Sequence, residues 1–237
     1  MGKNKLQRFA EMETFTNVVQ PVLDDIINTD HPLKGNWSST FFKNTNPIVL
    51  ELGCGKGEYT LGLAQKYPDK NFIGVDIKGA RIWAGAKEAL EKSLPNVGFL
   101  RTRIEQITSF FAANEISEIW ITFPDPQEKR IRSLKRLTSS RFLPRYQTFL
   151  KSQGIIHLKT DNTILYKYTS RLAKSNKFNI LVNTADLYNS GLSDEILSIR
   201  TFYESQYLAM GIPIKYICFT IPHTNEIRES YENEENS

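Results

Sequence analysis

Short apolar runs alternate with segments of helical spacing along most of this chain, and this pattern limits its possible folds more than any other feature. Each run is short and rich in β-branched and aromatic residues, as strands are. Strands that alternate with helices are joined by right-handed crossovers and build a mostly parallel sheet. The sequence therefore predicts a doubly wound α/β fold. The seven predicted strands are 47–52, 71–76, 97–102, 118–123, 154–160, 178–184 and 214–222.

The last of these strands is expected to run against its neighbours. It follows a short turn at 211–213, directly after a helical pattern over 194–210. Because parallel entry into a sheet needs a long crossover connection, the short turn predicts an antiparallel last strand.

One domain with two extensions is the simplest organisation for 237 residues. Residues 1–45 are expected to form an N-terminal extension with a short amphipathic helix near 18–27, and residues 46–225 to form the main domain. Residues 226–237 carry five glutamates and one arginine. This composition predicts a disordered acidic tail.

The composition excludes membrane-spanning, disulfide-rich and zinc-binding proteins. No apolar run approaches the ~18 residues of a membrane span. The two cysteines, Cys54 and Cys218, are too few for a disulfide framework or a zinc cluster. His31, His157 and His223 match no metal-ligand spacing, and His157 lies within an apolar strand, as a core histidine does. We expect no metal site and a cytoplasmic protein.

Positive charge is concentrated in one segment, which we call the basic stripe. Between residues 129 and 145 there are seven basic residues and no acid. A solvated helix surface is the ordinary explanation of such a run, but beside the end of a central strand it also suits phosphate contacts whose affinity falls with salt. The stripe consists of Lys129, Arg130, Arg132, Lys135, Arg136, Arg141 and Arg145. The expected contacts to an RNA backbone are Arg130, Arg132, Lys135 and Arg136.

The string GCGKG follows the first predicted strand and precedes a helix, so Gly53 and Gly55 permit a ligand to approach the backbone closely. A tight turn without a ligand is the alternative. Glu51 precedes the loop and Glu58 replaces the third glycine of a dinucleotide fingerprint, and these carboxylates favour an ammonium or sulfonium over a pyrophosphate. Asp76 ends the second strand, where an acid accepts the hydroxyls of an adenosine ribose or caps the next helix. Together these residues indicate S-adenosylmethionine as the cofactor.

The motifs of the chain resemble those of a known family. GKNKLQRFAE, ELGCGKGEYT, FPDP, RFL, HLKTDN and TFYE follow one another as in the bacterial tRNA (guanine-N7)-methyltransferases. The resemblance implies a Rossmann-like, seven-strand class I methyltransferase fold that uses S-adenosylmethionine to methylate N7 of a guanosine in the variable loop of tRNA. It implies tRNA as the partner, no obligatory protein partner, and a monomer or homodimer.

The resemblance also assigns site residues. It implies that Asp125, in FPDP at the end of a central strand, is catalytic and lies beside the cofactor. From the residues alone, Asp125 could instead open a proline-framed turn, Asp161 could cap a helix, and 201–204 could form an exposed helix face. The implied substrate contacts are Lys129, Asp161, Thr201, Phe202, Tyr203 and Glu204.

The chemistry of the expected reaction limits what these residues can do. Guanine N7 is a bare lone pair on the major-groove edge, so its methylation requires no general base. The protein then contributes in-line positioning and stabilisation of the positive charge that moves onto the purine. We expect Asp125 to accept hydrogen bonds from guanine N1 and N2, and Glu204 to accept one from the exocyclic amine.

Two places depart from the family pattern. Gln127 and Glu128 stand where relatives commonly have Trp-Pro, which removes a candidate for stacking on the base. Arg103 stands where relatives often have an acid or Asn near the adenine. Because a guanidinium cannot accept a hydrogen bond from the adenine amine, a backbone group is expected to make that contact, with Arg103 kept as a cofactor-binding residue.

Other functions stay open on the sequence. One is a methyltransferase that acts on another nucleobase or on a protein. Another is an RNA-binding protein that keeps the cofactor fold without activity. An NAD oxidoreductase is disfavoured because Glu51 and Glu58 oppose a pyrophosphate.

Overall fold

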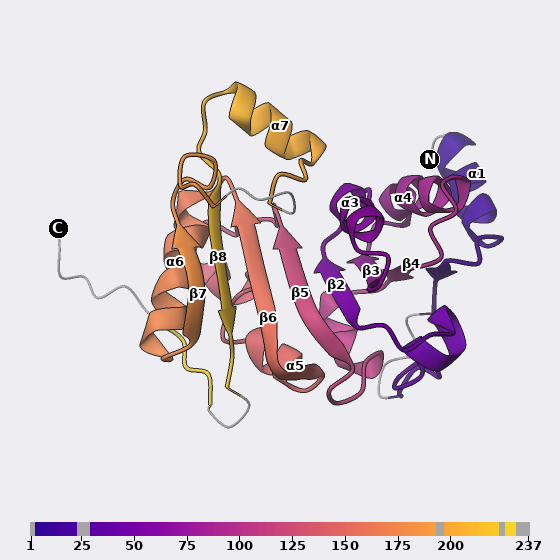
Figure 1. The fold of residues 1–237 in the computed structure, drawn as a ribbon, viewed down its shortest axis with the longest axis horizontal. Coiled ribbons are helices and arrows are strands. Elements are labelled where there is room, and N and C mark those ends of the chain that lie inside the picture. Colours follow the sequence, from indigo (N-terminus) through magenta and orange to yellow (C-terminus); the bar gives the residue numbers. More distant parts are fainter. Residues whose placement is uncertain (1–2, 23–28, 193–196, 223–225, 231–237) are drawn as a thin grey trace.

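A single eight-stranded sheet organises the computed structural model, which describes residues 3–22, 29–192, 197–222 and 226–230 (Figure 1). The strand order is β1-β4-β3-β2-β5-β6-β8-β7. All pairs from β1 to β6 are parallel, and β8 is antiparallel to both β6 and β7. The seven predicted strands and the antiparallel last strand are therefore confirmed. The strands are β1 (Val18–Val19), β2 (Ile48–Leu52), β3 (Asn71–Asp76), β4 (Val97–Arg101), β5 (Ile116–Thr122), β6 (Leu150–Thr160), β7 (Asn179–Thr184) and β8 (Lys215–Thr220).

Helices cover both faces of the sheet because its central strands are apolar on both sides. Val49 of β2 belongs to the core cluster that includes α3 and α4, whereas Ile48 and Leu50 belong to the cluster that includes α5 and α6. No helix in the described residues is both long and apolar enough to cross a membrane. The α-helices are α1 (Lys3–Met12), α3 (Glu58–Lys66), α4 (Gly79–Glu91), α5 (Leu143–Gln147), α6 (Thr163–Ser175) and α7 (Phe202–Ala209). Shorter helical segments are the π-helical η1 (Trp37–Phe42) and the 3-10 segments η2 (Ile104–Ser109) and η3 (Arg130–Lys135).

The N-terminal extension belongs to the same sheet. Val18 and Val19, predicted to begin a helix, instead form β1, and Val18 pairs with Phe99 of β4. The rest of that predicted helix falls partly on 23–28, outside the described residues. Helix α1 packs on α4, where Glu11 accepts a hydrogen bond from the Trp83 indole at 2.9 Å. Strand pairing thus overrides the local helical pattern.

The end of the chain also differs from expectation. The predicted helix over 194–210 is limited to α7, since 197–201 is not helical and 193–196 lies outside the described residues. Residues 226–230 pack against the domain rather than forming part of a disordered tail, because Ile227 is 7% exposed and joins the core. The remainder of the predicted tail, 231–237, lies outside the described residues, as does His223.

Candidate cofactor and substrate site

The loop between β2 and α3 forms the floor of the site, at the carboxyl edge of the parallel strands. Gly53, Gly55 and Gly57 have φ angles of 77°, 58° and 75°, a left-handed conformation that favours glycine. A Cβ atom on Gly57 would lie 2.7 Å from the Phe99 ring, whereas one on Gly55 would meet nothing within 4 Å. The loop therefore packs tightly on one side and presents open backbone on the other.

Two pockets meet at this loop. One lies between the loop, the end of β5 and the start of α7, and the other lies beyond Asp76 beside η2. Gly53 lines both. An elongated ligand could therefore cross the loop, with one end in each pocket. The first pocket is lined by Glu51, Gly53, Cys54, Gly55, Lys56, Glu58, Arg81, Thr122, Phe123, Thr201, Phe202 and Tyr203. The second is lined by Gly53, Asp76, Ile77, Thr102, Arg103, Ile104, Glu105, Lys135, Leu137 and Phe142.

Glu51 is a buried carboxyl at the base of the first pocket. Its Oε1 accepts from the Thr122 hydroxyl at 2.6 Å, and its Oε2 accepts from the Thr60 backbone N–H at 2.8 Å and from the Thr60 hydroxyl. Burial raises the pKa of Glu51 to about 7, although these hydrogen bonds act in the opposite direction. A cation in the first pocket would favour the ionised form.

Asp76 ties the loop to the second pocket. Its Oδ2 accepts from the Gly55 N–H at 3.0 Å and its Oδ1 accepts from the Lys78 N–H at 2.7 Å. Lys78, not Asp76, is the N-cap residue of α4. Each carboxylate oxygen retains a lone pair, so Asp76 can hold the loop and also accept from a ligand in the second pocket.

Besides Asp76, three charged residues line the second pocket, and one of them, Glu105, was not predicted from the sequence. Arg103, the N-cap residue of η2, is exposed and lines this pocket, and its contact with the cofactor stays a prediction. Glu105 lines the same pocket, and its carboxylate is a hydrogen-bond acceptor, which a guanidinium is not. The signal in the sequence that could have identified this residue was the presence of an acid two positions after Arg103. Lys135, assigned to RNA, also lines this pocket.

Asp125 lies on the exposed loop that follows β5. Its Oδ1 accepts from the Gln127 N–H at 3.1 Å, so the turn-opening role exists in the structure. Asp125 is absent from the lining of both pockets, but Thr122 and Phe123 line the first. Phe123 and Gln127 have positive φ angles of 46° and 47°. Such strained backbone is concentrated at functional sites.

Arg136 does not lie on the exposed surface of the basic stripe, where it was expected to contact RNA. Its side chain is 4% exposed. Its guanidinium donates to the carbonyl oxygens of Pro126, Gln127 and Glu128 at 3.1–3.3 Å and lies 4.4 Å from the centre of the Tyr168 ring. Arg136 therefore holds the loop that carries Asp125. Four other members of the basic stripe are exposed on or beside η3: Lys129, Arg130, Arg132 and Lys135.

The motif at the start of α7 divides into exposed and buried residues. Phe202 and Tyr203 are exposed and line the first pocket together with Thr201, whose hydroxyl caps α7 by accepting from the Glu204 N–H at 3.2 Å. Glu204 is fully buried. The prediction of an exposed helix face is therefore wrong for Glu204. Its burial also contradicts the prediction that Glu204 contacts guanine directly.

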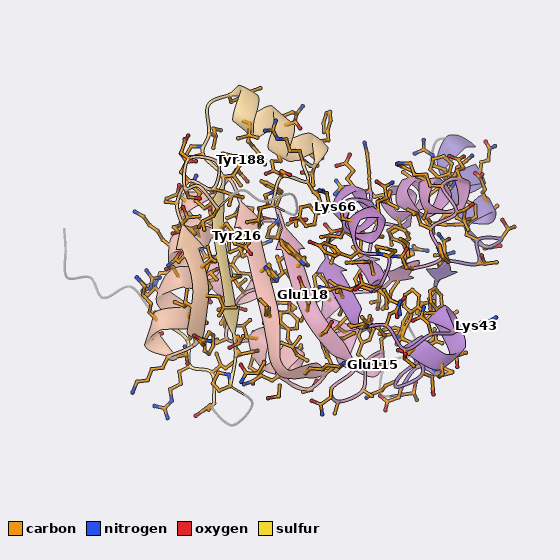
Figure 2. All side chains as sticks on the ribbon, viewed as in Figure 1. Lys43, Lys66, Glu115, Glu118, Tyr188 and Tyr216 are labelled. Atoms are coloured by element: carbon orange, nitrogen blue, oxygen red, sulfur yellow. The ribbon has the colours of Figure 1, made fainter. Side chains whose placement is uncertain are left out.

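Glu204 pairs with Lys159 inside the protein. The Lys159 Nζ lies 2.8 Å from Glu204 Oε1, which also accepts from the Tyr188 hydroxyl at 2.8 Å. Lys159 also donates to the carbonyl oxygens of Leu197 and Ile199 at 2.5 and 3.1 Å. This cluster joins β6 to the segment that enters α7, and α7 lies beyond the carboxyl ends of the central strands (Figure 1). Figure 2 shows Tyr188 between α7 and the sheet.

The remaining candidates have clear positions. Asn162, not Asp161, caps α6 by accepting from the Leu165 N–H at 2.9 Å. Asp161 is half-buried, and burial raises its pKa. Its carboxylate does not cap the helix, so the substrate contact stays a prediction. His157 is a core residue as predicted, since its Nδ1 lies 2.7 Å from the Tyr216 hydroxyl and its ring stacks on Trp120 at 3.9 Å.

Comparisons with known proteins give one consistent answer. A family model described as "Putative methyltransferase" matches residues 45–217. A tRNA (guanine-N(7)-)-methyltransferase of Christiangramia forsetii is 57% identical over 221 residues, which cover 93% of this chain and 99% of the relative. One from Bacteroides fragilis is 53% identical over 229 residues, covering 97% of this chain and 90% of the relative. Among solved structures, the 16S rRNA methyltransferase KamB matches 74% of this chain and 88% of its own with a TM-score of 0.57 at 14% identity. At that identity the likeness concerns the fold alone, and it confirms the Rossmann-like methyltransferase fold.

Proposed function

The chain belongs to the tRNA (guanine-N(7)-)-methyltransferase family, and from that premise we propose how its residues carry out the reaction. The protein transfers a methyl group from S-adenosylmethionine to N7 of a guanosine in tRNA. The observation that carries the residue assignment is the pair of pockets that meet at Gly53, one beside Glu51 and the other beside Asp76.

The two pockets fit the chemistry of S-adenosylmethionine. Asp76 supplies acceptors for a ribose diol, and Glu105 an acceptor for the adenine amine. Glu51 supplies a buried carboxyl for the α-ammonium, and the open backbone at Gly55 permits close approach. When bound, the cofactor supplies an electrophilic methyl group on a sulfonium.

The substrate side of the site is formed by the Asp125 loop and the start of α7. Phe202 and Tyr203 expose aromatic rings at the first pocket, where a purine can stack. We assign Asp125 the role of accepting from guanine N1 and N2, which orients N7 and favours the cationic product. Lys129 and Asp161 are assigned to the surrounding nucleotide, and Arg130 and Arg132 to RNA phosphates.

The organisation of the chain follows from the same proposal. We assign 46–225 to the methyltransferase domain, with 1–45 as an extension packed on it. We propose a monomer or homodimer without an obligatory protein partner, as the resemblance to the family implies. We place the reaction in the cytoplasm, where bacterial tRNA is located, and both cysteines are free thiols there.

The direct test is mass spectrometry of nucleosides from unmodified tRNA after incubation with the protein and S-adenosylmethionine. We expect 7-methylguanosine to appear. A different methylated nucleoside would assign another base, and retention of tRNA without any methylation would indicate an RNA-binding protein.

Replacing Asp125 by Asn should lower kcat at least about hundredfold, because one electrostatic contact made in the transition state is typically worth that much. The dissociation constant of tRNA should stay within about twofold, since phosphate contacts dominate affinity. The matched control is Asp69→Asn, an exposed acid between α3 and β3 that lines neither pocket of the site. Undiminished turnover in Asp125→Asn would exclude the assigned role.

Cofactor affinity should increase with pH because of Glu51. With a pKa near 7, its carboxyl is mostly neutral at about pH 6 and mostly ionised at about pH 7.5, so a ligand that needs the ionised form binds up to about eightfold more weakly at the lower pH. Calorimetry at about pH 6, in buffers of different ionisation enthalpy, should detect proton release on binding. In Glu51→Gln both effects should disappear, and their persistence would assign them to another group.

Replacing Lys129 and Arg132 together by Ala should weaken tRNA binding and reduce the slope of log affinity against log salt by about two. Both side chains are exposed and line neither pocket of the site, so cofactor affinity should not change. Lys92→Ala serves as the control, because Lys92 is an exposed residue at the C-cap of α4 that pairs with Glu88. An unchanged slope in the double variant would remove these residues from the RNA surface.

A further inference from the structure

The last described segment of the chain, residues 226–230, forms a C-terminal strap across α6. Ile227 anchors it in the core. The Arg228 N–H donates to Asn176 Oδ1 at 2.8 Å, and the Arg228 carbonyl accepts from Asn176 Nδ2 at 2.8 Å. The strap is therefore held by an apolar side chain and by its backbone, which fixes where the next residue, Glu229, must lie.

Glu229 enters a pocket between η3 and α6. Its Oε2 accepts from the Ser140 hydroxyl at 2.5 Å, and the neighbouring Ser230 hydroxyl accepts from Arg171 Nε at 3.2 Å. Arg130, Arg136 and Arg171 line the pocket, together with the acids Glu128 and Glu229. Among the described residues that line the pocket, Glu128 and Glu229 are the acids beside these three guanidinium groups.

This pocket adjoins the loop that carries Asp125. Arg136 forms part of the pocket wall and donates to three backbone carbonyls of that loop. Tyr168, also in the wall, packs against Arg136 at 4.4 Å. Its pKa is raised by burial and by the nearby Glu229 charge. The side chain of Arg136 therefore connects an anion in this pocket to the loop that carries Asp125.

The groups in the pocket suit a phosphate at least as well as a carboxylate. Guanidinium groups and hydroxyls donate to both, and the guanidinium fork of arginine matches the geometry of either anion. The positive surface also continues along α6, because Arg171 lines an adjoining groove with Lys167 and Lys174. Glu229 thus interrupts a basic surface that runs from η3 to α6.

We propose that this pocket binds a backbone phosphate of the tRNA, and that the Glu229 carboxylate, which lines the pocket, competes with the phosphate until the RNA displaces the strap. The inference rests on the proposed function, since it takes tRNA as the ligand. It adds Arg171 of α6 to the RNA surface and gives Glu229 a role as a competitor for that surface.

The first test compares tRNA dissociation constants by fluorescence anisotropy at low salt. Glu229→Gln should bind tRNA at least about threefold more tightly, because removing the competing charge enlarges the fraction of protein that is ready to bind. The matched control is Glu226→Gln, which removes the same charge from an exposed strap residue that pairs with Arg228 at 3.6 Å. It should bind like the unaltered protein. Equal affinities for Glu229→Gln and the unaltered protein, or equal gains in the two variants, would overturn the proposal.

The second test has two parts. One measures how much the pocket contributes to tRNA binding, and the other detects displacement of the strap by tRNA. Arg171→Ala should weaken tRNA binding by about fivefold or more and lower the salt slope by about one, and adding Glu229→Gln to it should give a smaller gain than in the unaltered protein. Hydrogen exchange at the Arg228 amide should accelerate when tRNA is saturating. Unchanged protection there, or full additivity of the two substitutions, would contradict displacement of the strap by RNA. These are binding measurements, so failure to form 7-methylguanosine would reject the proposed function without deciding them.

Discussion

Replacing Lys159 by Met should abolish detectable tRNA methylation and lower the free energy of unfolding by about 3–5 kcal/mol, the typical cost of leaving a buried charge without its partner. Lys159 and Glu204 are both fully buried, with 2.8 Å between Nζ and Oε1. The second oxygen of Glu204, Oε2, has no hydrogen-bond partner among the described residues. Removal of Lys159 therefore takes away the cation 2.8 Å from Glu204 Oε1, and the Tyr188 hydroxyl still donates to that oxygen.

The expected loss of activity has a geometric cause. Lys159 also holds the carbonyl groups of Leu197 and Ile199, which precede α7. Without it, Phe202 and Tyr203 lose a fixed position at the first pocket, and a displacement of about 1 Å at a site can cost about a hundredfold in rate. Lys159 is absent from the lining of both pockets of the site, so we assign it a positioning role.

Three measurements separate positioning from general destabilisation. Chemical denaturation gives the free energy of unfolding, calorimetry gives cofactor affinity, and initial rates give KM for tRNA and kcat. The double variant Lys159→Met with Glu204→Leu should recover stability without recovering kcat, because it removes the unpaired charge but not the missing anchor. Lys70→Met is the matched control, since its partner Glu118 lies 3.3 Å away in a partly exposed pair, worth about 1 kcal/mol or less. Full activity in a folded Lys159→Met protein would exclude the positioning role.

The second large effect is expected at a glycine outside the glycine-rich loop. A Cβ atom on Gly85 of α4 would lie 2.3 Å from the Lys56 carbonyl oxygen and 2.9 Å from the Phe99 ring. Because the first of these is backbone, the β2–α3 loop itself must move. We expect Gly85→Ala to weaken S-adenosylmethionine binding at least about tenfold and to destabilise the fold by about 1–3 kcal/mol, as overpacking does.

Helix propensity alone predicts the opposite change in stability for Gly85→Ala. In a helix interior, Gly→Ala ordinarily stabilises by up to about 1 kcal/mol, so a loss of stability would itself indicate the clash. Glu88→Ala, on the exposed side of the same helix, controls for changes to α4 alone and should leave cofactor affinity intact. Calorimetric titration with S-adenosylmethionine decides the question, and unchanged affinity in Gly85→Ala would mean that the loop tolerates the displacement.

Local patterns determined much of this protein. Strand runs such as 71–76 and 118–123 are visible in sequence because apolar residues of β type recur there and turns bound them. The glycine-rich loop is equally local, since a left-handed backbone at Gly53 and Gly55 requires particular residues at particular positions. For the same reason Glu51 and Asp76, which sit at fixed distances from strand ends, could be placed at the site in advance.

Tertiary structure alone decided which polar side chains turn inward. Arg132 and Arg136 belong to one uninterrupted basic run, yet one is exposed and the other is buried beneath the Asp125 loop. The partner of Glu204 could not be predicted from the sequence, because Lys159 lies 45 positions earlier, on another element. Val18 and Val19 became a strand only because β4 offered an edge to pair with. Periodicity reports the neighbours that a residue has along the chain, whereas the burial of a charge depends on partners that only the folded topology brings within reach.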